Sequence, residues 1–489
     1  MKLKRNLHPE IFGVKSNGEI SRSAKTLLDA LYEEGIIPTY SFPKNVVSVY
    51  IPNGSGKIEY QPDRGLDIAI SEYALGRSIV IDKQTYQIGG MYFYGGEYSR
   101  EPARKFLADE NYLKNLLTCD KCGWFGLAEE NYKQCPFCGN ENLKSEKPML
   151  KPLGFLPKNA MPISQAQLEE EYSFAQPPEY STLPENDEMI NIKSLKNIRL
   201  ASRKNQRIIM LNKGPAEKGF VICKDCGAAM PNTNENPLKN IVRPYKAKFD
   251  CHHTDKMTVN LGFDFITDML VLEIALDNKK IDTRNDSKNL WMIRAAQSFA
   301  EAFRLAASHE LDVDFNELVT GYRIRRTDTE KTFVDVYIYD NLSSGAGYSV
   351  RISSEIENLL NKTREILTSC DCESACQNCL KHYRNQFVHG RLDRFYGLNL
   401  LDWAISGKLT DEIPFDTQKK YFNSIENIES SFKIEEVNRK FYLLSKNRKY
   451  EVIIYPAMHA EKFSKDKIYI CDSFFKYAKP YIFNQVQDF

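Results

Sequence analysis

Eleven of the twelve cysteines lie in three short-spaced clusters, which constrain the fold more than any other feature of the chain. The first cluster, CDKCGWFGLAEENYKQCPFCG, places Cys119, Cys122, Cys135 and Cys138 at the spacing C-x2-C-x12-C-x2-C. Each pair forms a tight turn followed by glycine, and two such turns point four thiolates at one ion. The pattern predicts a structural zinc ribbon with all four positions filled by protein, rather than free buried cysteines.

The second cluster combines one cysteine turn with a distant Cys-His pair. CKDCG supplies Cys223 and Cys226, and CHH supplies Cys251 with His252 and His253. One turn plus a cysteine and a histidine completes a second closed site, in which we favour His253 over His252. A redox C-x-x-C motif is the alternative, but no thioredoxin-like strand, turn and helix surround it.

The third cluster wraps one loop around a single ion at the end of a helix. Cys370, Cys372, Cys376 and Cys379 follow the spacing C-x-C-x3-C-x2-C. Four thiolates select Zn²⁺ or an iron–sulfur cluster, and the spacing alone does not exclude the latter. We favour zinc because the other two clusters are typical of zinc, so the expected cofactors are two or three Zn²⁺ ions.

Two basic segments stand out on a chain whose 66 Lys and Arg nearly balance 65 Asp and Glu. Bulk attraction to nucleic acid is therefore excluded, and any contact must come from local patches. The segments cover residues 193–218 and 381–394, and side chains of these types contact phosphates and bases. A solvated face with paired charges is the alternative. The candidate nucleic-acid contacts are Arg203, Lys204, Arg207, Lys381, Arg384, Asn385, Arg391 and Arg394.

Catalytic motifs are missing from the sequence. The nearest approach to a phosphate-binding loop, NGSGKIEY, lacks the first glycine and the Ser or Thr after the lysine, so we expect neither ATP hydrolysis nor another enzymatic activity. Asp340 precedes Gly345 and Gly347 at a strand end, where α/β sheets bind ligands, although a glycine-rich capped turn is the simpler interpretation. A nuclease that binds a divalent ion through Asp335 and Asp340 is the alternative from another class.

The length of 489 residues exceeds the usual size of one hydrophobic core, so several units are expected. The predicted fold is multi-module α+β: a mixed α/β domain with a four-cysteine zinc loop, a zinc ribbon and a second Cys/His zinc module. The predicted modules are an amino-terminal α+β domain (1–105), the ribbon (106–150), a connector with the basic segment and second zinc module (151–257), the α/β domain (258–405) and a module of unknown role (406–489).

Hydrophobic periodicity predicts the main elements. A helix is expected over 24–31, and TDMLVLEIAL and TFVDVYIYD are typical of strands, the latter with Val334, Val336 and Ile338 on its buried face. A capping box of Ser354 and Glu357 predicts the start of the helix that leads into the third cluster. One stripe of a long helix comprises Ile293, Ala296, Ala300, Phe303 and Ala307.

The amino terminus and the apolar stretches indicate a cytoplasmic protein. MKLKRNLHPEIFGVKS has no apolar run of signal-peptide length, and the longest apolar stretch, MLVLEIAL, is too short to cross a bilayer. We expect no membrane partner.

Residues 339–394 resemble a known domain. YDNLSSGAG, a helix and CDCESACQNCLKHYRNQFVHGRLDR are similar to the carboxy-terminal zinc-binding domain of MrfA-type superfamily-2 DNA helicases. The shared positions after the cysteines are Leu380, Asn385, Leu392, Asp393 and Arg394. Upstream, DRGLDIAISEYALG, GFVICKDCG and LGFDFITDMLVL resemble segments of the same broader group, so the resemblance spans most of residues 60–405.

The helicase motor motifs are missing from this sequence, which has no Walker motif and no DEAH-like box. Chains of this kind without motor domains resemble the DrmB component of DISARM bacterial antiphage systems. The resemblance implies a separate helicase partner, DrmA-like, with which the chain acts on invading DNA. We therefore expect a non-catalytic, zinc-binding accessory subunit that assists DNA binding or loading, with a pure protein-assembly scaffold or the nuclease as alternatives.

Overall fold

The computed structural model describes residues 46–53, 57–93, 101–164, 173–175, 178–180, 188–233, 242–244, 246–284, 291–326, 331–341, 345–426, 434–445, 448–460 and 466–482. The helix expected over 24–31 lies outside these ranges. Among the described residues, no helix combines the length and the apolar composition needed to cross a membrane.

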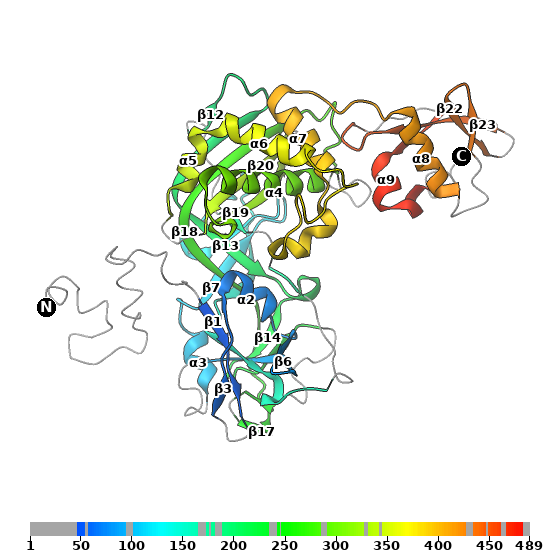
Figure 1. Cartoon of the computed structure of the whole chain (residues 1–489). Helices are drawn as coiled ribbons and strands as arrows, with labels where there is room; N and C mark the ends of the chain where they lie inside the picture. Colours follow the sequence, from blue (N-terminus) through cyan, green and yellow to red (C-terminus); the bar gives the residue numbers. More distant parts are fainter. Residues whose placement is uncertain are drawn as a thin grey trace. The chain divides into compact units, whose positions relative to one another are not determined.

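The chain divides into two compact units, each drawn from three separate stretches (Figure 1). The five modules predicted above are consecutive in sequence, whereas contacts in the folded chain join segments that are distant in sequence. Helix α3 (Pro102–Leu107) and strand β14 (Phe220–Cys223) lie where the chain passes from one unit to the other. The first unit takes Met1–Arg104, Pro152–Tyr172 and Ile222–Lys256; the second takes Lys105–Lys151, Ser173–Val221 and Met257–Phe489.

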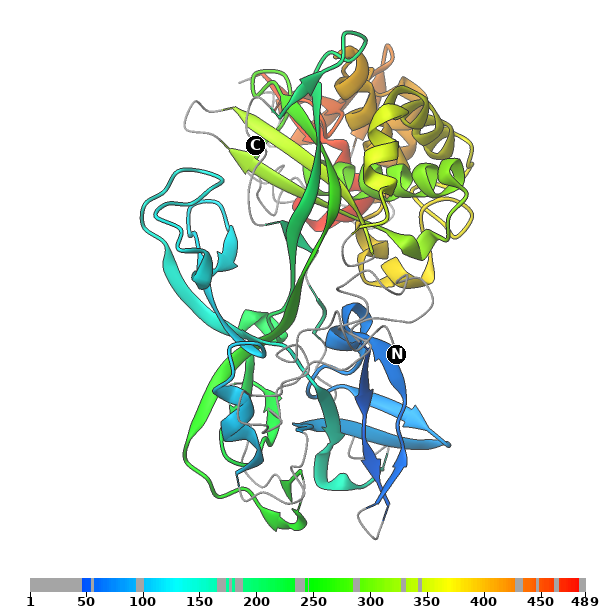
Figure 2. The same cartoon turned by 90° about the vertical axis from the view of Figure 1, so that its left-hand side faces the viewer.

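A five-stranded sheet with the order β4-β1-β10-β6-β5 organises the first unit (Figure 2). Strand β10 runs parallel to β1 and antiparallel to β6, so a late segment is inserted between two early strands. Helix α2 buries Leu66, Ala69 and Ile70. The elements of this unit are β1 (Val46–Val49), β2 (Ile51–Pro52), β3 (Ile58–Tyr60), β4 (Asp63–Gly65), α2 (Leu66–Glu72), β5 (Ser78–Ile81), β6 (Gln84–Met91), β10 (Gly154–Pro157), η6 (Lys158–Ala160), β15 (Ala229–Pro231), β16 (Val242–Arg243) and β17 (Lys246–Asp250).

The 21-residue strand β18 (Lys256–Leu276) is the axis of the sheet in the second unit. Strand β13 (Ile198–Asn212) pairs along one side, while β9 (Lys144–Leu150) and β20 (Thr332–Asp340) pair with the two halves of the other side. One strand thus joins the segment of the first cysteine cluster to the domain of the third. The remaining elements around this sheet are β7 (Leu113–Thr118), β8 (Phe125–Leu127), η5 (Ala128–Glu130), β11 (Glu179–Tyr180), β12 (Ile190–Asn191), η8 (Pro215–Glu217), η9 (Phe315–Glu317) and β19 (Leu318–Arg326).

Helices cover one face of this sheet. Helices α4 (Trp291–Leu311), α6 (Ile356–Thr368) and α7 (Arg394–Ser406) share a core with the inward side chains of β18 and β20 (Figure 1). The predicted stripe of α4 is buried except at Ile293, which is partly exposed. The expected buried face of β20, with Val334, Val336 and Ile338, is confirmed.

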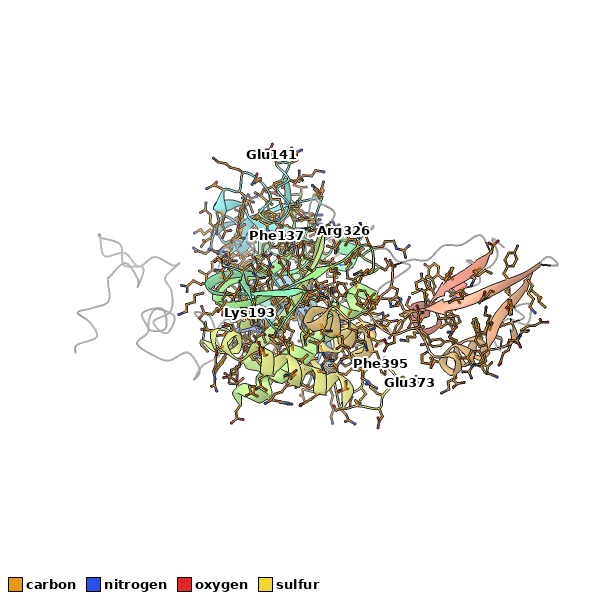
Figure 3. All side chains as sticks on the ribbon, turned by 90° about the horizontal axis from the view of Figure 1, so that it is seen from above. Phe137, Glu141, Lys193, Arg326, Glu373 and Phe395 are labelled. Atoms are coloured by element: carbon orange, nitrogen blue, oxygen red, sulfur yellow. The ribbon has the colours of Figure 1, made fainter. Side chains whose placement is uncertain are left out.

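The first cysteine ribbon covers the opposite face of the sheet. Trp124 and Phe137 of the ribbon share a core with Tyr337 and Tyr339 of β20. Phe137 is buried in this core, whereas Glu141 is exposed and lies at the outer edge (Figure 3). Strand β20 is therefore buried on both faces, which its alternating sequence does not reveal.

The predicted capping box is wrong. A short helix, α5 (Tyr348–Ser354), comes first, and α6 begins only at Ile356 after the non-helical Glu355. The Ser354 hydroxyl donates to the carbonyl of Arg351 at 2.7 Å and does not cap α6. The hydroxyl is satisfied inside the preceding turn, so the pairing with Glu357 is lost.

The last described segment is a four-stranded sheet with the order β21-β22-β23-β24 and two helices on one face. Phe422 and Phe475 of these helices contact each other, and Phe422 also contacts Phe441 of the sheet. A β-bridge between Ile281 and His459 ties the segment to the rest of the second unit. The elements are α8 (Phe415–Glu426), β21 (Ile434–Val437), β22 (Lys440–Ser445), β23 (Arg448–Tyr455), β24 (Lys467–Cys471) and α9 (Asp472–Tyr477).

Candidate metal centres and the adjoining loop

The structure brings together three tetrads, in each of which the four ligand atoms lie within 4.8 Å of one another. A tetrahedral Zn²⁺ with Zn–S bonds of about 2.3 Å separates its sulfurs by roughly 3.8 Å. Closest contacts between Sγ atoms run from 3.5 to 3.8 Å. The tetrads therefore fit a single ion each, and a cluster of several irons would need the sulfurs farther apart. Their members are Cys119, Cys122, Cys135 and Cys138; Cys223, Cys226, Cys251 and His253; and Cys370, Cys372, Cys376 and Cys379.

Two backbone turns shape the ribbon tetrad. The amide of Gly123 donates to the carbonyl of Cys119 at 2.8 Å, and that of Gly139 donates to Cys135 at 2.9 Å. Both glycines have φ near +70°, which L side chains rarely adopt. The side-chain amide of Asn140 lies 3.5 Å from the sulfur of Cys119.

The second tetrad lies wholly in the first unit. The amide of Gly227 donates to the carbonyl of Cys223 at 3.0 Å and closes the turn. The Nδ1 atom of His253 is 3.3 Å from the sulfur of Cys223, whereas His252 is exposed. The structure therefore places His253, the histidine favoured from sequence, beside the cysteines.

The third tetrad follows α6 and is held by a buried arginine. Arg394 donates from Nε to the carbonyl of Cys372 and from Nη1 to the carbonyl of Leu367, both at 3.0 Å. The amide of Cys376 points at the sulfur of Cys379 at 3.2 Å. The loop and the helix before it are thus fixed by one side chain.

One thiol of each tetrad has a lowered pKa. Burial alone raises the pKa of Cys119, but donation by Asn140 and neighbouring groups brings it to about 6. Hydrogen bonds with the Cys223 and Cys226 thiols lower the pKa of Cys251 to about 3. Donation by the Cys372 backbone lowers the pKa of Cys370 to about 7. Burial raises the pKa of the neighbouring Cys122 and Cys372, and thiol hydrogen bonds raise that of Cys226. The grouping of four donor atoms, rather than the pKa values, is therefore what fits a thiolate-preferring ion.

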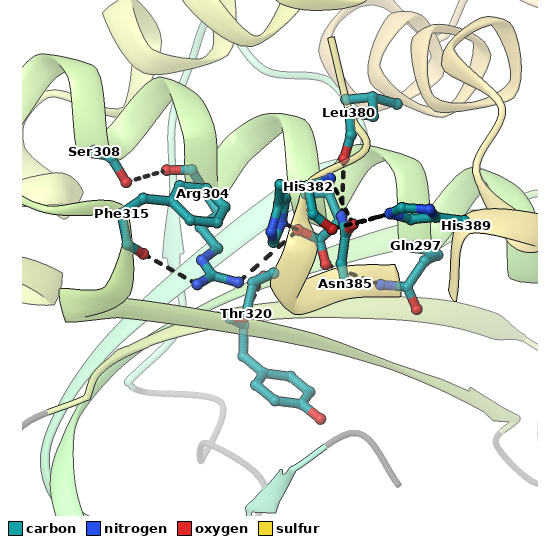
Figure 4. Close-up of polar contacts among 11 residues, drawn as sticks. Gln297, Arg304, Ser308, Phe315, Thr320, Leu380, His382, Asn385 and His389 are labelled. Carbon is teal, nitrogen blue, oxygen red and sulfur yellow. Dashed lines mark hydrogen bonds and ion pairs between the residues drawn. The ribbon is translucent and has the colours of Figure 1, made fainter. Parts of the chain in front are cut away.

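A polar network ties the loop after the third tetrad to α4 (Figure 4). His382 Nε2 lies 3.2 Å from a carboxylate oxygen of the buried Glu301, while the same ring accepts from the backbone amide of Asn385. Arg304 packs 3.9 Å from the ring of Phe315, which contacts His382 edge-on. Together, these contacts join the loop to more than one turn of α4. They therefore hold the loop backbone in place.

Residues 299–380 match the family described as the MrfA Zn-binding domain. The matched segment contains most of α4, strands β19 and β20, helices α5 and α6 and the third tetrad. The match confirms the predicted family resemblance and supports zinc as the metal of the chain.

Two curated proteins are similar to the chain. Druantia protein DruE from Escherichia coli strain UMEA 4076-1 is 33% identical over 423 residues, which are 80% of this chain and 22% of DruE. The uncharacterized protein MJ1572.1 from Methanocaldococcus jannaschii is 27% identical over 90 residues, which are 18% of this chain and 80% of that protein. The chain spans about a fifth of the length of DruE.

Solved structures of the DUF1998 helicase MrfA also overlap with the chain. The DNA-bound form gives a TM-score of 0.33 at 11% identity and covers 80% of this chain and 40% of that one. The form with DNA and AMPPNP gives 0.31 at 9% identity, with 75% and 32% covered. TM-scores this low carry no argument about function.

Two of the three candidate contacts in the first basic segment are paired with acids. Arg207 on β13 forms ion pairs with Glu130 and Asp264. Arg203 Nε lies 3.5 Å from Glu188. Only Lys204, of the three candidates here, is exposed and outside the ion pairs of the described residues. Of the candidate contacts in this segment, Lys204 is therefore the one with a charge that faces solvent.

The second basic segment separates into internal and exposed residues. Asn385 and Arg394 are 5% and 7% exposed and bond to carbonyls within the chain, so they differ from the expected surface contacts. Lys381 is partly exposed and Arg391 exposed. The side chain of Arg384 lies outside the described ones.

Sequence reasoning missed the buried polar stripe of α4. Its members bond to the loop after the third tetrad or to one another, as when Arg294 donates to the carbonyl of Gly390 at 2.6 Å. Their regular helical spacing within an alanine-rich helix is the signal that identifies such a stripe. The members are Arg294, Gln297, Glu301, Arg304 and Ser308.

The two carboxylates considered for a nuclease are engaged within the chain. Asp340 accepts from the backbone amides of Ala346, Tyr348 and Ser349 at 2.6 to 3.1 Å. Asp335 pairs with the buried Arg325 at 2.5 Å. Burial raises the pKa of both acids. The interpretation of Asp340 as part of a capped turn matches this arrangement.

Proposed function

We propose that the chain is a non-catalytic, zinc-binding accessory component that helps a superfamily-2 helicase bind or load on DNA in bacterial antiphage defence. The observation that carries the proposal is the match to the MrfA Zn-binding domain, in which the third tetrad and the polar network hold a loop with accessible basic side chains. Saturated tetrads stabilise a fold and leave no coordination position for catalysis.

The relationship to DruE favours a Druantia-type system over the DISARM-type system with a DrmA-like helicase. Capture with the tagged chain from its native cell tests the partner. A stoichiometric superfamily-2 helicase among the captured proteins supports the proposal. Captured material that contains DNA but no helicase contradicts the proposal.

The non-catalytic part of the proposal is supported by the internal partners of Asp335 and Asp340, which leave no open carboxylate pair at these two positions. The purified chain is expected to leave DNA intact in Mg²⁺ or Mn²⁺. Cleavage that persists through purification and disappears in Asp340→Asn would establish the nuclease instead.

DNA contact is assigned to the partly exposed Lys381 and the exposed Arg391, neither of which forms an ion pair among the described residues, although Arg391 hydrogen-bonds to Tyr322. Each phosphate contact contributes about one unit to the slope of log affinity against log salt. The variant with Lys381→Met and Arg391→Met is expected to bind DNA several-fold more weakly, with a slope smaller by about two.

The matched control is Lys57→Met, which removes an exposed lysine from the first unit. Fluorescence anisotropy across a salt series measures both quantities. An unchanged slope in the double variant removes the loop from the DNA-binding surface. Helicase capture without any DNA binding by the isolated chain supports the scaffold alternative.

A further inference from the structure

Tyr383, at the start of η10 (Tyr383–Arg391), is the most exposed large side chain of apolar character among the described residues, at 71%. Single exposed aromatic rings are common and by themselves indicate nothing. The surroundings of this ring are unusual, because the backbone on both sides is held by buried polar groups.

The residues around Tyr383 are fixed by several hydrogen bonds. The amide of His382 donates to the side-chain oxygen of Asn385 at 2.9 Å, and the amide nitrogen of Asn385 donates to the carbonyl of Leu380 at 2.8 Å. Because the His382 ring accepts from the Asn385 amide, its Nε2 carries the proton and donates to Glu301. His389 Nε2 also lies 2.8 Å from the Asn385 oxygen. The ring is thus displayed on a preorganised loop.

Two basic residues flank Tyr383 in the sequence of the loop. Lys381 lies two residues before it and Arg391 closes the same short helical segment. The acidic residues that precede this loop in sequence, Asp371 and Glu373, belong to the tetrad loop and are exposed. An exposed aromatic ring in the same loop as cations that form no ion pair among the described residues has the chemistry of sites that bind single strands, where bases stack and phosphates contact lysine and arginine.

We propose that Tyr383 stacks on an unpaired base, so that this loop takes single-stranded nucleic acid. The inference rests on the proposed function, since it assumes that Lys381 and Arg391 contact nucleic acid. Stacking tolerates any base, because every base has a π-face, and preorganisation reduces the entropy lost on binding. Duplex bases hide these faces, so a duplex meets only the cations.

The test compares affinities of the full zinc-loaded chain for a labelled oligothymidylate and for a duplex of equal length. Tyr383→Ala is expected to weaken single-strand binding about tenfold and to leave duplex binding within about twofold. Tyr383→Phe keeps the ring and is expected to bind the single strand like the wild type. Tyr481→Ala, which removes a tyrosine that is 40% exposed elsewhere in the unit, is the matched control.

Zinc content and circular dichroism establish that each variant is folded. If the wild type binds neither nucleic acid, the proposed function fails and the stacking proposal fails with it. Stacking is overturned if the wild type binds and Tyr383→Ala has the same affinity for the single strand. It is also overturned if Tyr383→Ala weakens binding of the single strand and of the duplex equally. In both cases the proposed function stands. Stacking is also overturned if Tyr383→Phe loses as much affinity for the single strand as Tyr383→Ala does.

Discussion

Arg394 illustrates how a basic side chain next to a metal site can act inside the protein. The residue is 7% exposed, and its guanidinium bonds to the carbonyls of Cys372 and Leu367 and packs 4.0 Å from the ring of Phe395. A buried carbonyl that loses its donor costs about 1–3 kcal/mol. Arg394 therefore links the shape of the third tetrad to the stability of the domain.

Replacing this arginine is expected to weaken both the fold and the metal site. Arg394→Met leaves two carbonyls without donors, so the free energy of unfolding falls by about 3 kcal/mol. Zinc transfer to a chromogenic chelator becomes faster. Arg351→Met, which replaces an arginine with a 60% exposed side chain in the same domain, is expected to change neither quantity. Equal zinc-transfer rates in the two variants would contradict the role of Arg394.

At the level of single residues, the sequence predicted the metal-ligand sets. It did not predict the roles of the basic residues. Cysteine spacing encodes local turns, so the tetrads follow from short segments of sequence. The burial of Asn385 and Arg394 depends on contacts with distant segments, and Glu301 lies 81 residues from its partner His382. Sequence position alone cannot separate these internal groups from Lys381, which stays at the surface.

Among the elements, α9 joins the carboxy-terminal sheet to the zinc-binding domain. The hydroxyl of Tyr477 donates to Asp393 at 2.5 Å, and Arg294 lies 3.5 Å from the Tyr477 ring. Asp393 also caps α7 by accepting from the amide of Phe395. The segment of unknown role is therefore packed on the residues that follow the third tetrad.

Removing the hydroxyl tests this junction. Tyr477→Phe keeps the ring under Arg294 but takes a donor from the fully buried Asp393 carboxylate, so the free energy of unfolding is expected to fall by about 2 kcal/mol. Denaturant unfolding measures the change. Tyr442→Phe, on the sheet face that the helices do not cover, serves as the control. A Tyr477→Phe chain as stable as this control would show that the junction contributes nothing.

The sequence predicted element boundaries that depend on local residues alone. It missed boundaries that depend on contacts with a distant segment. The apolar run TDMLVLEIAL gives only the second half of β18, because the first half is extended by pairing with β9 and β13. Ser354 and Glu357 have the spacing of a capping box, yet the serine is part of α5 and bonds within that helix. Both differences come from neighbours that local periodicity cannot represent.

For the whole molecule, the distribution of the metal sites between the two units is the important feature. The second tetrad lies in the first unit, and the other two lie in the second. A structural zinc site contributes its binding free energy, on the order of 10 kcal/mol, to the folding of the unit that holds it. Loss of one ion is therefore expected to affect one unit.

Cysteine variants in the two units test this independence. Cys226→Ser is expected to lower the zinc content by one equivalent and to raise hydrogen exchange in β6, whose Met91 bonds to the turn at Gly227, while α4 stays protected. Cys379→Ser is expected to do the reverse, because its tetrad supports the loop packed against α4. Elemental analysis gives the zinc content, and mass spectrometry after deuterium exchange locates the exposed segments. Exposure of both units in either variant would mean that the chain unfolds as one cooperative body, since metal loss would then spread beyond the unit that binds it.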